Sequence, residues 1–164
     1  MSGQDALYDR DFFAWTEEQA ARLRAAAAAG TNAPIDWAHV ATEIEDLGRS
    51  AARELLSRLT TITEHLLKLE RSADPRPRAG WVRTVLRERL AVLDLLEENP
   101  SLRPRVAGML PVARERALKL LGAQASRGVE GRAPSGPAED AARWSEEQIL
   151  GEFLPGQPDG ASRA

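Results

Sequence analysis

Apolar residues recur every three or four positions along most of this chain, which is the spacing of an α-helix that buries one face. No segment of strand length alternates apolar with polar residues. The pattern therefore predicts an all-α fold, a helical bundle of about five helices with a short additional helix near the C-terminus.

The first predicted helix begins near Tyr8 and ends in the alanine run at 25–29, where Gly30 provides a C-terminal cap. Asp9 or Asp11 can cap its beginning. Alternatively, Thr16 to Gln19 reads as a capping box, and the helix begins there with the aromatic residues packed before it. The inward positions at helical spacing are Tyr8, Phe12, Trp15, Gln19 and Leu23.

A helix capped by Asp36 and a longer central helix ending at Arg71 follow, with Gly48 between their apolar patterns. The inward stripe of the first comprises Trp37, Val40, Ile44 and Leu47. The central helix carries a wide apolar arc made of Leu55, Leu56, Leu59, Ile62, Thr63, Leu66, Leu67 and Leu69. A single rod over both would be about 54 Å long, more than a compact domain of this size needs, so we expect a bend at Gly48.

Two further helices follow a proline-containing loop. The first spans about 81–98 and stops at Asn99 and Pro100. Ser101 can cap the second, which runs to Leu121 and is expected to kink at Pro111 because proline lacks the N–H that an interior helical position needs.

The chain thus reads as a helical-bundle core at 8–121 followed by three smaller segments. Residues 122–140 are rich in Gly, Pro, Ser and Ala and predict a flexible loop. Residues 141–155 predict a short docking helix that begins at a second capping-box pattern, and 156–164 a disordered tail.

The amino-acid composition excludes several classes of site and function. The 164 residues include no cysteine, which excludes disulfides, thiolate metal sites and a cysteine nucleophile, and suits a cytoplasmic protein. The N-terminus lacks a leader pattern, and no apolar run approaches the roughly 18 residues that span a bilayer, so no membrane partner is expected.

Residues 71–119 hold 11 basic against 6 acidic side chains, while the flanking segments are acidic. Either acidic and basic helices face each other, or the basic region binds nucleic acid.

Several short blocks give the chain a family resemblance. They are Asp11-Phe12 with Trp15 and Gln19-Ala20, Asp36-Trp37, the run from Glu43 to Ser50, His65 to Lys68, Trp81 to Arg83 with Arg87 to Arg89, Ser101 to Pro104, and Gln148 to Leu150 with Phe153 to Pro155. In these blocks the chain resembles a bacterial family known as domain-of-unknown-function family 29, from about Tyr8 to Leu121 and again near the C-terminus. The resemblance implies an all-helical fold and no established activity.

Carboxylate and imidazole side chains at three- and four-residue spacing form the one candidate metal site, which would make the protein a metal-dependent enzyme. Its residues are Asp36, His39, Glu43 and Asp46, with His65 on the next helix. The Glu-x-x-His motif typical of di-metal bundles is absent. Asp36 is better explained as a helix cap, and Glu43 with Asp46 as partners for arginine, so no cofactor is expected. Gly-rich phosphate loops and Gly-x-Ser-x-Gly are also missing, so catalytic residues stay unknown and an enzyme of familiar type is not expected.

The nucleic-acid alternative depends on arginines around the loop and two helix starts, near Trp81. They are Arg76, Arg78, Arg83, Arg87, Arg103 and Arg105. Against it, the chain is acidic overall, with a net charge of −3, and Trp81 falls in an apolar arc.

A buried polar cluster is predicted around Arg89, which falls by helical phase among apolar residues. A buried guanidinium needs a partner, because an unpaired buried charge costs several kcal/mol. We expect Glu43 or Glu45 to supply it, with Gln19 nearby. The leading hypothesis is a cytoplasmic helical protein that acts through protein contacts, including contacts between its own copies.

Overall fold

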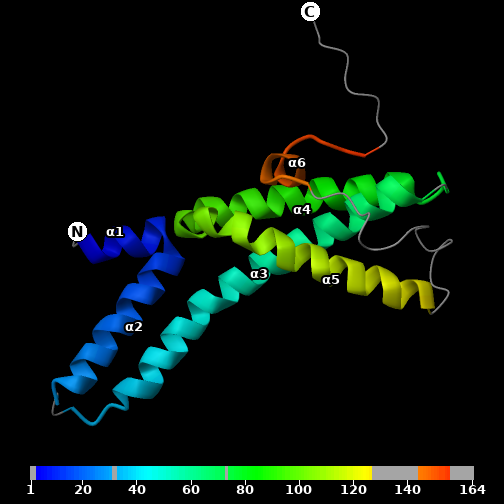
Figure 1. Ribbon diagram of the computed structural model, residues 1–164. Helices are drawn as coiled ribbons and strands as arrows, with labels where there is room; N and C mark the ends of the chain where they lie inside the picture. The colour runs from blue at the N-terminus through cyan, green and yellow to red at the C-terminus, as the bar shows by residue number, and fades with distance from the viewer. Residues whose placement is uncertain (1–2, 31–32, 73, 127–143, 156–164) are drawn as a thin grey trace, which may run out of the picture. The chain divides into compact units, whose positions relative to one another are not determined.

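The computed structural model describes residues 3–30, 33–72, 74–126 and 144–155, and every regular element in these ranges is helical (Figure 1). The all-α prediction is therefore confirmed. The elements are α1 (Gly3–Arg10), α2 (Phe12–Ala28), α3 (Trp37–Arg71), α4 (Arg78–Glu98), the 3₁₀ helix η1 (Pro100–Arg105), α5 (Val106–Ser126) and α6 (Glu146–Leu150). The chain divides into unit 1, Met1–Leu55 with Leu93–Arg105, and unit 2, Leu56–Val92 with Val106–Ala164.

Asp11 separates α1 from α2 and caps α2, since its Oδ1 accepts a hydrogen bond from the Ala14 N–H at 2.9 Å. The alternative start at Thr16 is wrong. Thr16 is a fully buried residue inside α2 whose hydroxyl donates to the Phe13 carbonyl at 2.7 Å. At the other end Gly30 has a φ of 71°, a left-handed conformation that favours glycine, as the C-cap prediction requires.

The expected bend at Gly48 is wrong, because α3 is one continuous helix of 35 residues. Gly48 has a different role in unit 1, where α2 and the first half of α3 run side by side (Figure 1). A Cβ atom at Gly48 would lie 2.1 Å from the Thr16 hydroxyl oxygen. The glycine thus lets two helix backbones approach closely rather than turning the chain.

The α4–α5 connection in unit 1 attaches to the start of α2. Ser101 does not cap a helix, contrary to expectation, because its N–H and hydroxyl both donate to the Asp11 carboxylate, at 2.7 and 2.8 Å. Asn99 accepts a hydrogen bond from the Phe13 N–H at 3.0 Å. Residues 100–105 form the 3₁₀ helix η1 instead of the first turns of α5, and α5 begins at Val106.

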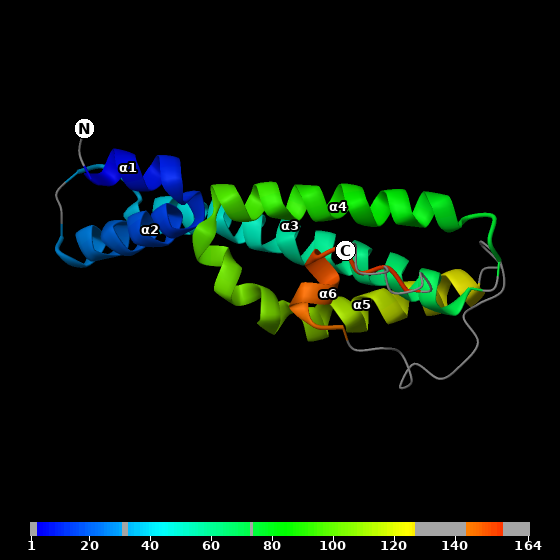
Figure 2. The same cartoon turned by 90° about the horizontal axis from the view of Figure 1, so that it is seen from above.

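Unit 2 contains the second half of α3, most of α4 and all of α5, which lie side by side in both views (Figures 1 and 2). Its fully buried apolar residues include Leu59, Ile62, Leu66, Leu67, Val85, Val92, Val106, Ala113 and Ala117. Helix α5 continues through Pro111, whose ring leaves the Ala107 carbonyl without its usual helical donor. The helix also includes residues 122–126, where a loop was expected, while 127–140 and the tail at 156–164 lie outside the described residues.

Helix α6 begins at the predicted capping box. The Ser145 hydroxyl accepts from the Gln148 N–H at 3.2 Å, and the Gln148 side chain accepts from the Ser145 N–H at 3.0 Å. Ile149 is buried, and α6 contacts α5 within unit 2. No described helix is both long enough and apolar enough to cross a membrane.

Candidate functional site

Arg89 on α4 is buried, with 4% of its surface exposed, and its guanidinium holds residues 144–155, the C-terminal segment of unit 2. Its Nε donates to the Ile149 carbonyl at 2.8 Å. Its Nη2 donates to the carbonyls of Gln148 and Phe153, at 2.9 and 2.7 Å. Burial lowers the pKa of Arg89, and its Nη1 is buried without a hydrogen-bond partner.

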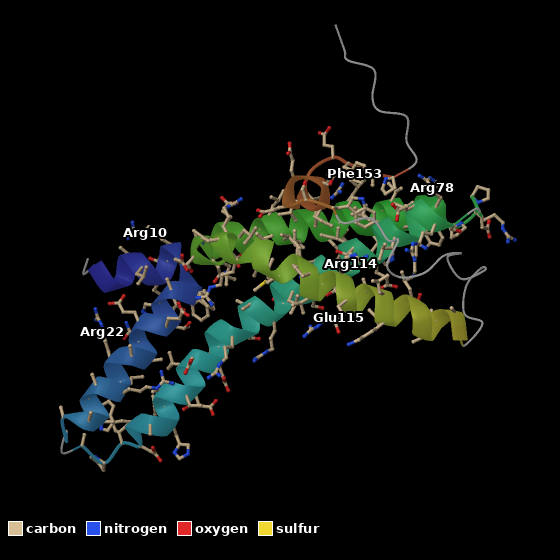
Figure 3. All side chains as sticks on the ribbon, in the orientation of Figure 1. Arg10, Arg22, Arg78, Arg114, Glu115 and Phe153 are labelled. Atoms are coloured by element: carbon tan, nitrogen blue, oxygen red, sulfur yellow. The ribbon has the colours of Figure 1, made fainter. Side chains whose placement is uncertain are left out.

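The reason for this arrangement lies at the end of α6. The last carbonyls of a helix lack partners within the helix and carry partial negative charge, so a cation there is favourable. A second arginine of α4, Arg78, donates to the carbonyls of Leu69, at 3.0 Å, and Pro155 (Figure 3). Two arginines therefore anchor the segment that follows α6.

The burial of Arg89 was predicted, but its expected partners are wrong. The hydrogen bonds that the structure gives it end on main-chain carbonyls instead of a carboxylate. Glu43 is exposed and Gln19 half-buried, while Glu45 accepts from Arg24, which lowers the pKa of that carboxyl. Helical phase shows that Arg89 faces inward, but a carbonyl has no sequence signal that would identify it as the partner.

The candidate metal ligands take part in local pairs. Asp36 accepts a hydrogen bond from the His39 N–H at 3.1 Å, and its Oδ2 lies 2.5 Å from the His39 Nδ1. This contact lowers the pKa of Asp36 and raises that of His39.

Two of the remaining candidates also have other partners, while Glu43 is exposed. Asp46 pairs with Arg49 at 2.9 Å, and the His65 Nδ1 lies 2.9 Å from the Thr61 carbonyl oxygen. Within the described ranges, no three side chains of ligating type come together as a metal site.

The structure distributes the candidate nucleic-acid arginines between the two units. Arg103 and Arg105 belong to unit 1, and the other four, at 76, 78, 83 and 87, to unit 2. Three of the six have acidic partners: Arg76 with Asp74, Arg87 with Glu88, and Arg105 with Glu17. Arg105 also lies over the Phe13 ring, 4.4 Å from its centroid. These pairs neutralise part of the positive charge that binding to phosphate would need.

A pocket of about 460 Å³ opens in unit 2, and sequence reasoning missed it. Its walls come from α3, α5 and the C-terminal segment, and they are formed by Thr63, Ala107, Leu110, Pro111, Arg114, Trp144 and Ile149. The sequence signals near it were Pro111 in a helix interior and the docking helix predicted at 141–155. The two residues after 143 that complete the wall are far away in sequence, so no local pattern connects them to α5.

Helix α3 exposes apolar side chains in unit 1 that were expected to face inward. Leu47 is 52% exposed and Val40 39%, while Trp37 and Ile44 are half-buried. The cause is the direction from which α2 packs: it covers the side of α3 that carries Gly48, about 100° around the helix from Leu47. We call Trp37, Val40, Ile44 and Leu47 the α3 edge.

Comparison with known proteins agrees with this architecture. An α-helical protein of unknown function from Rhodospirillum rubrum is similar in structure, with a TM-score of 0.67 and 28% sequence identity over 88% of this chain and 89% of that one. No curated protein gave a match. Residues 7–152 match the domain of unknown function DUF29, which confirms the resemblance seen in the sequence. The chain belongs to the DUF29 family.

Proposed function

We propose that this protein is a protein-interaction module, that its docking surface is the α3 edge, and that a second copy of the chain occupies it. The observation that carries the proposal is the exposure of Val40 and Leu47 on a row with half-buried Trp37 and Ile44. Their spacing of three, four and three residues is that of a seam between two packed helices. Isolated exposed apolar residues are normal, but a row at this spacing is typical of an interface.

The polar residues around the α3 edge favour a basic partner surface. Asp36 and Glu43 are exposed on its flank. A partner helix with apolar residues and arginines would therefore bury the edge and face its acids with opposite charge.

The chain itself offers such a surface on α4 in unit 2. Leu86 and Leu90 are 49% and 64% exposed there, and the side chains of Arg83 and Arg87 are exposed beside them. We call these four residues the α4 face. Docking of the α3 edge of one copy on the α4 face of another would bury both apolar rows, as helices do in the layers of helical bundles.

Sedimentation equilibrium at roughly 10–100 µM, concentrations at which weak self-association is populated, tests the proposal. The wild-type protein should be a dimer and the Leu47→Lys variant a monomer. The substitution should preserve α3, because the new lysine follows Glu43 by four residues, the order in which such a pair stabilises a helix. Leu90→Lys should have the same effect. Val112→Lys is the control, since Val112 is similarly exposed, at 41%, but belongs to neither surface.

Mixing the two variants makes the test specific. Each retains one intact surface, so Leu47→Lys and Leu90→Lys together should form a heterodimer although neither associates alone. A wild-type monomer at the highest concentration, an equal effect of Val112→Lys, or a mixture that stays monomeric would each overturn the proposal.

A further inference from the structure

We infer that the docking surface of unit 1 is two helices wide, and that the α4 face of the second copy packs on α2 as well as on the α3 edge. This inference rests on the proposed function and names the second half of the same surface. The α3 edge contains four residues. Specific protein interfaces contain roughly 20–30 residues on each side, so a stable dimer needs contacts from a second element of unit 1.

Helix α2 supplies this element through a row of half-buried residues. The sequence predicts that this row faces inward, but the buried side of α2 instead carries Phe13, Thr16 and Ala20. The residues of the row recur at helical spacing and none is charged. We call them the α2 row: Phe12, Trp15, Gln19 and Leu23.

The α2 row and the α3 edge lie on the same face of unit 1. Helix α2 and the first half of α3 run side by side in opposite directions, and Thr16 meets Gly48 where they touch (Figure 1). Trp15 comes one residue before Thr16 and is therefore rotated from this contact by about 100°. Leu47 comes one residue before Gly48 and is rotated by the same angle in the same sense. In an antiparallel pair of helices, equal rotations from the contact bring both residues to the same side.

An ion pair on the other face of unit 1 supports this geometry. Arg24 of α2 and Glu45 of α3 are rotated from the Thr16–Gly48 contact in the opposite sense, by about 80° and about 60°. The two side chains pair with each other. The face that carries this ion pair and the face that carries the α2 row are therefore on opposite sides of the two helices.

Aromatic rings extend the apolar face where α1 joins α2. Tyr8 of α1 is 50% exposed, and its ring contacts those of Trp15 and Phe12 edge-on, with centroids 4.9 and 5.8 Å away. Tyrosine and tryptophan are enriched at protein interfaces, because they bury a large area with few rotatable bonds. We call Tyr8, the α2 row and the α3 edge together the unit 1 face.

Gln19 lies near the middle of the unit 1 face. It follows Thr16 by three residues, and Ile44 precedes Gly48 by four, so the two lie at nearly the same height along the antiparallel pair. A helix that packs between two others fits its side chains among those of both neighbours. The α4 face of the second copy would therefore cover Gln19 and bring its two arginines close to it.

Sedimentation equilibrium on the full chain tests the inference. Gln19→Lys keeps a long side chain with a good helix propensity, but it places a positive charge where the arginines of the α4 face would approach. It should raise the Kd of the dimer at least roughly tenfold. Tyr8→Lys should have the same effect, and because Tyr8 is exposed the fold should tolerate the substitution.

Ala21→Lys is the matched control. It adds the same charge to the same helix at an exposed position, rotated from Thr16 by about 140° toward the face that carries Arg24. Its Kd should equal that of the wild-type protein. Circular dichroism should show the same helix content in all three variants.

Mixtures assign Gln19 to one of the two docking surfaces. Gln19→Lys leaves the α4 face intact and Leu90→Lys leaves the unit 1 face intact. These two variants should therefore form a heterodimer at a concentration where each alone is monomeric, which also shows that Gln19→Lys is folded. Gln19→Lys and Leu47→Lys alter the same face, so their mixture should stay monomeric.

A higher Kd in Gln19→Lys and Tyr8→Lys, with none of this change in Ala21→Lys, supports the two-helix surface. A dimer that dissociates in Leu47→Lys but keeps its Kd in Gln19→Lys or Tyr8→Lys would overturn this inference and leave the proposed function standing. An equal loss in Ala21→Lys, or a heterodimer of Gln19→Lys with Leu47→Lys, would do the same. A wild-type protein that is monomeric at the highest concentration would overturn both.

Discussion

Gly48 of α3 lies so close to Thr16 of α2 that a Cβ atom would stand 2.1 Å from the threonine hydroxyl oxygen and 3.2 Å from its Cβ. Real side-chain carbons do not approach this closely, so the spacing of the two helices in unit 1 depends on glycine at position 48. Thr16 in turn is fully buried, with its hydroxyl hydrogen used on the Phe13 carbonyl.

Gly48→Ala should therefore lower the free energy of unfolding by about 1–3 kcal/mol, the usual cost of overpacking. The sign is informative, because alanine in a helix is otherwise favoured over glycine by about 1 kcal/mol. Urea unfolding followed by circular dichroism measures it.

Two variants check this explanation. Gly80→Ala in α4, where an added Cβ would meet nothing within 4 Å, should leave stability unchanged or raise it. Adding Thr16→Ala to Gly48→Ala should recover part of the loss, since it removes the nearest atom. Stability that is unchanged in Gly48→Ala would show that α2 and α3 are further apart than described.

Arg89→Met should destabilise unit 2 by about 3 kcal/mol, because it removes three hydrogen bonds to carbonyls and leaving a buried acceptor unsatisfied costs roughly 1–3 kcal/mol. The aliphatic stem is largely preserved, so the loss reports on the guanidinium. Arg116→Met, at an exposed position of α5 in the same unit, is the control and should change little. Hydrogen exchange should accelerate at residues 146–151 in Arg89→Met. Unchanged protection there would mean that the guanidinium does not anchor the segment.

Asp11→Ala should lower stability by about 2 kcal/mol, since it removes the cap of α2 together with both hydrogen bonds from Ser101. Asp9→Ala removes an exposed carboxylate two residues away and should have little effect. Ser101→Ala should show a smaller loss than Asp11→Ala, because only the hydrogen bond that the hydroxyl donates to Asp11 disappears while the one from the Ser101 N–H remains. If urea unfolding shows the same loss of stability in Asp9→Ala as in Asp11→Ala, this explanation is wrong.

His39 should titrate above its ordinary pKa of about 6.5, because Asp36 raises that pKa. A raised folded-state pKa means that the contribution of His39 to stability is fully present below about pH 6.5 and disappears as the pH rises through the folded value. Asp36 has a lowered pKa, so its contribution is present above about pH 3.8 and disappears as the pH falls through its folded value. NMR titration of the His39 ring, repeated in Asp36→Asn, measures the shift; an identical midpoint in both proteins would show that the contact is absent in solution.

The sequence by itself determined the all-α fold, the C-terminal end of α4, the C-terminal glycine of α2 and the capping box of α6, because each depends on local chemistry. A helix has one period, a capping side chain bonds to N–H groups two or three residues away, and glycine at positive φ needs no distant partner. The inward direction of Arg89 followed from phase in the same way.

Only the tertiary structure decided what each face meets. A glycine at position 48 predicts a bend in the helix, but in the structure Gly48 is the point at which α2 packs on α3. Arg89 points inward as predicted, but its partners are carbonyls of a segment roughly 60 residues away, and a carbonyl is present at every residue. The stripe at Trp37 to Leu47 has the spacing of a core helix, whereas α2 covers only part of it. Local patterns show which residues are apolar enough to be buried. They do not show which residues will contact them, because the contacting helices come from distant parts of the chain and no short-range rule describes how those helices pack.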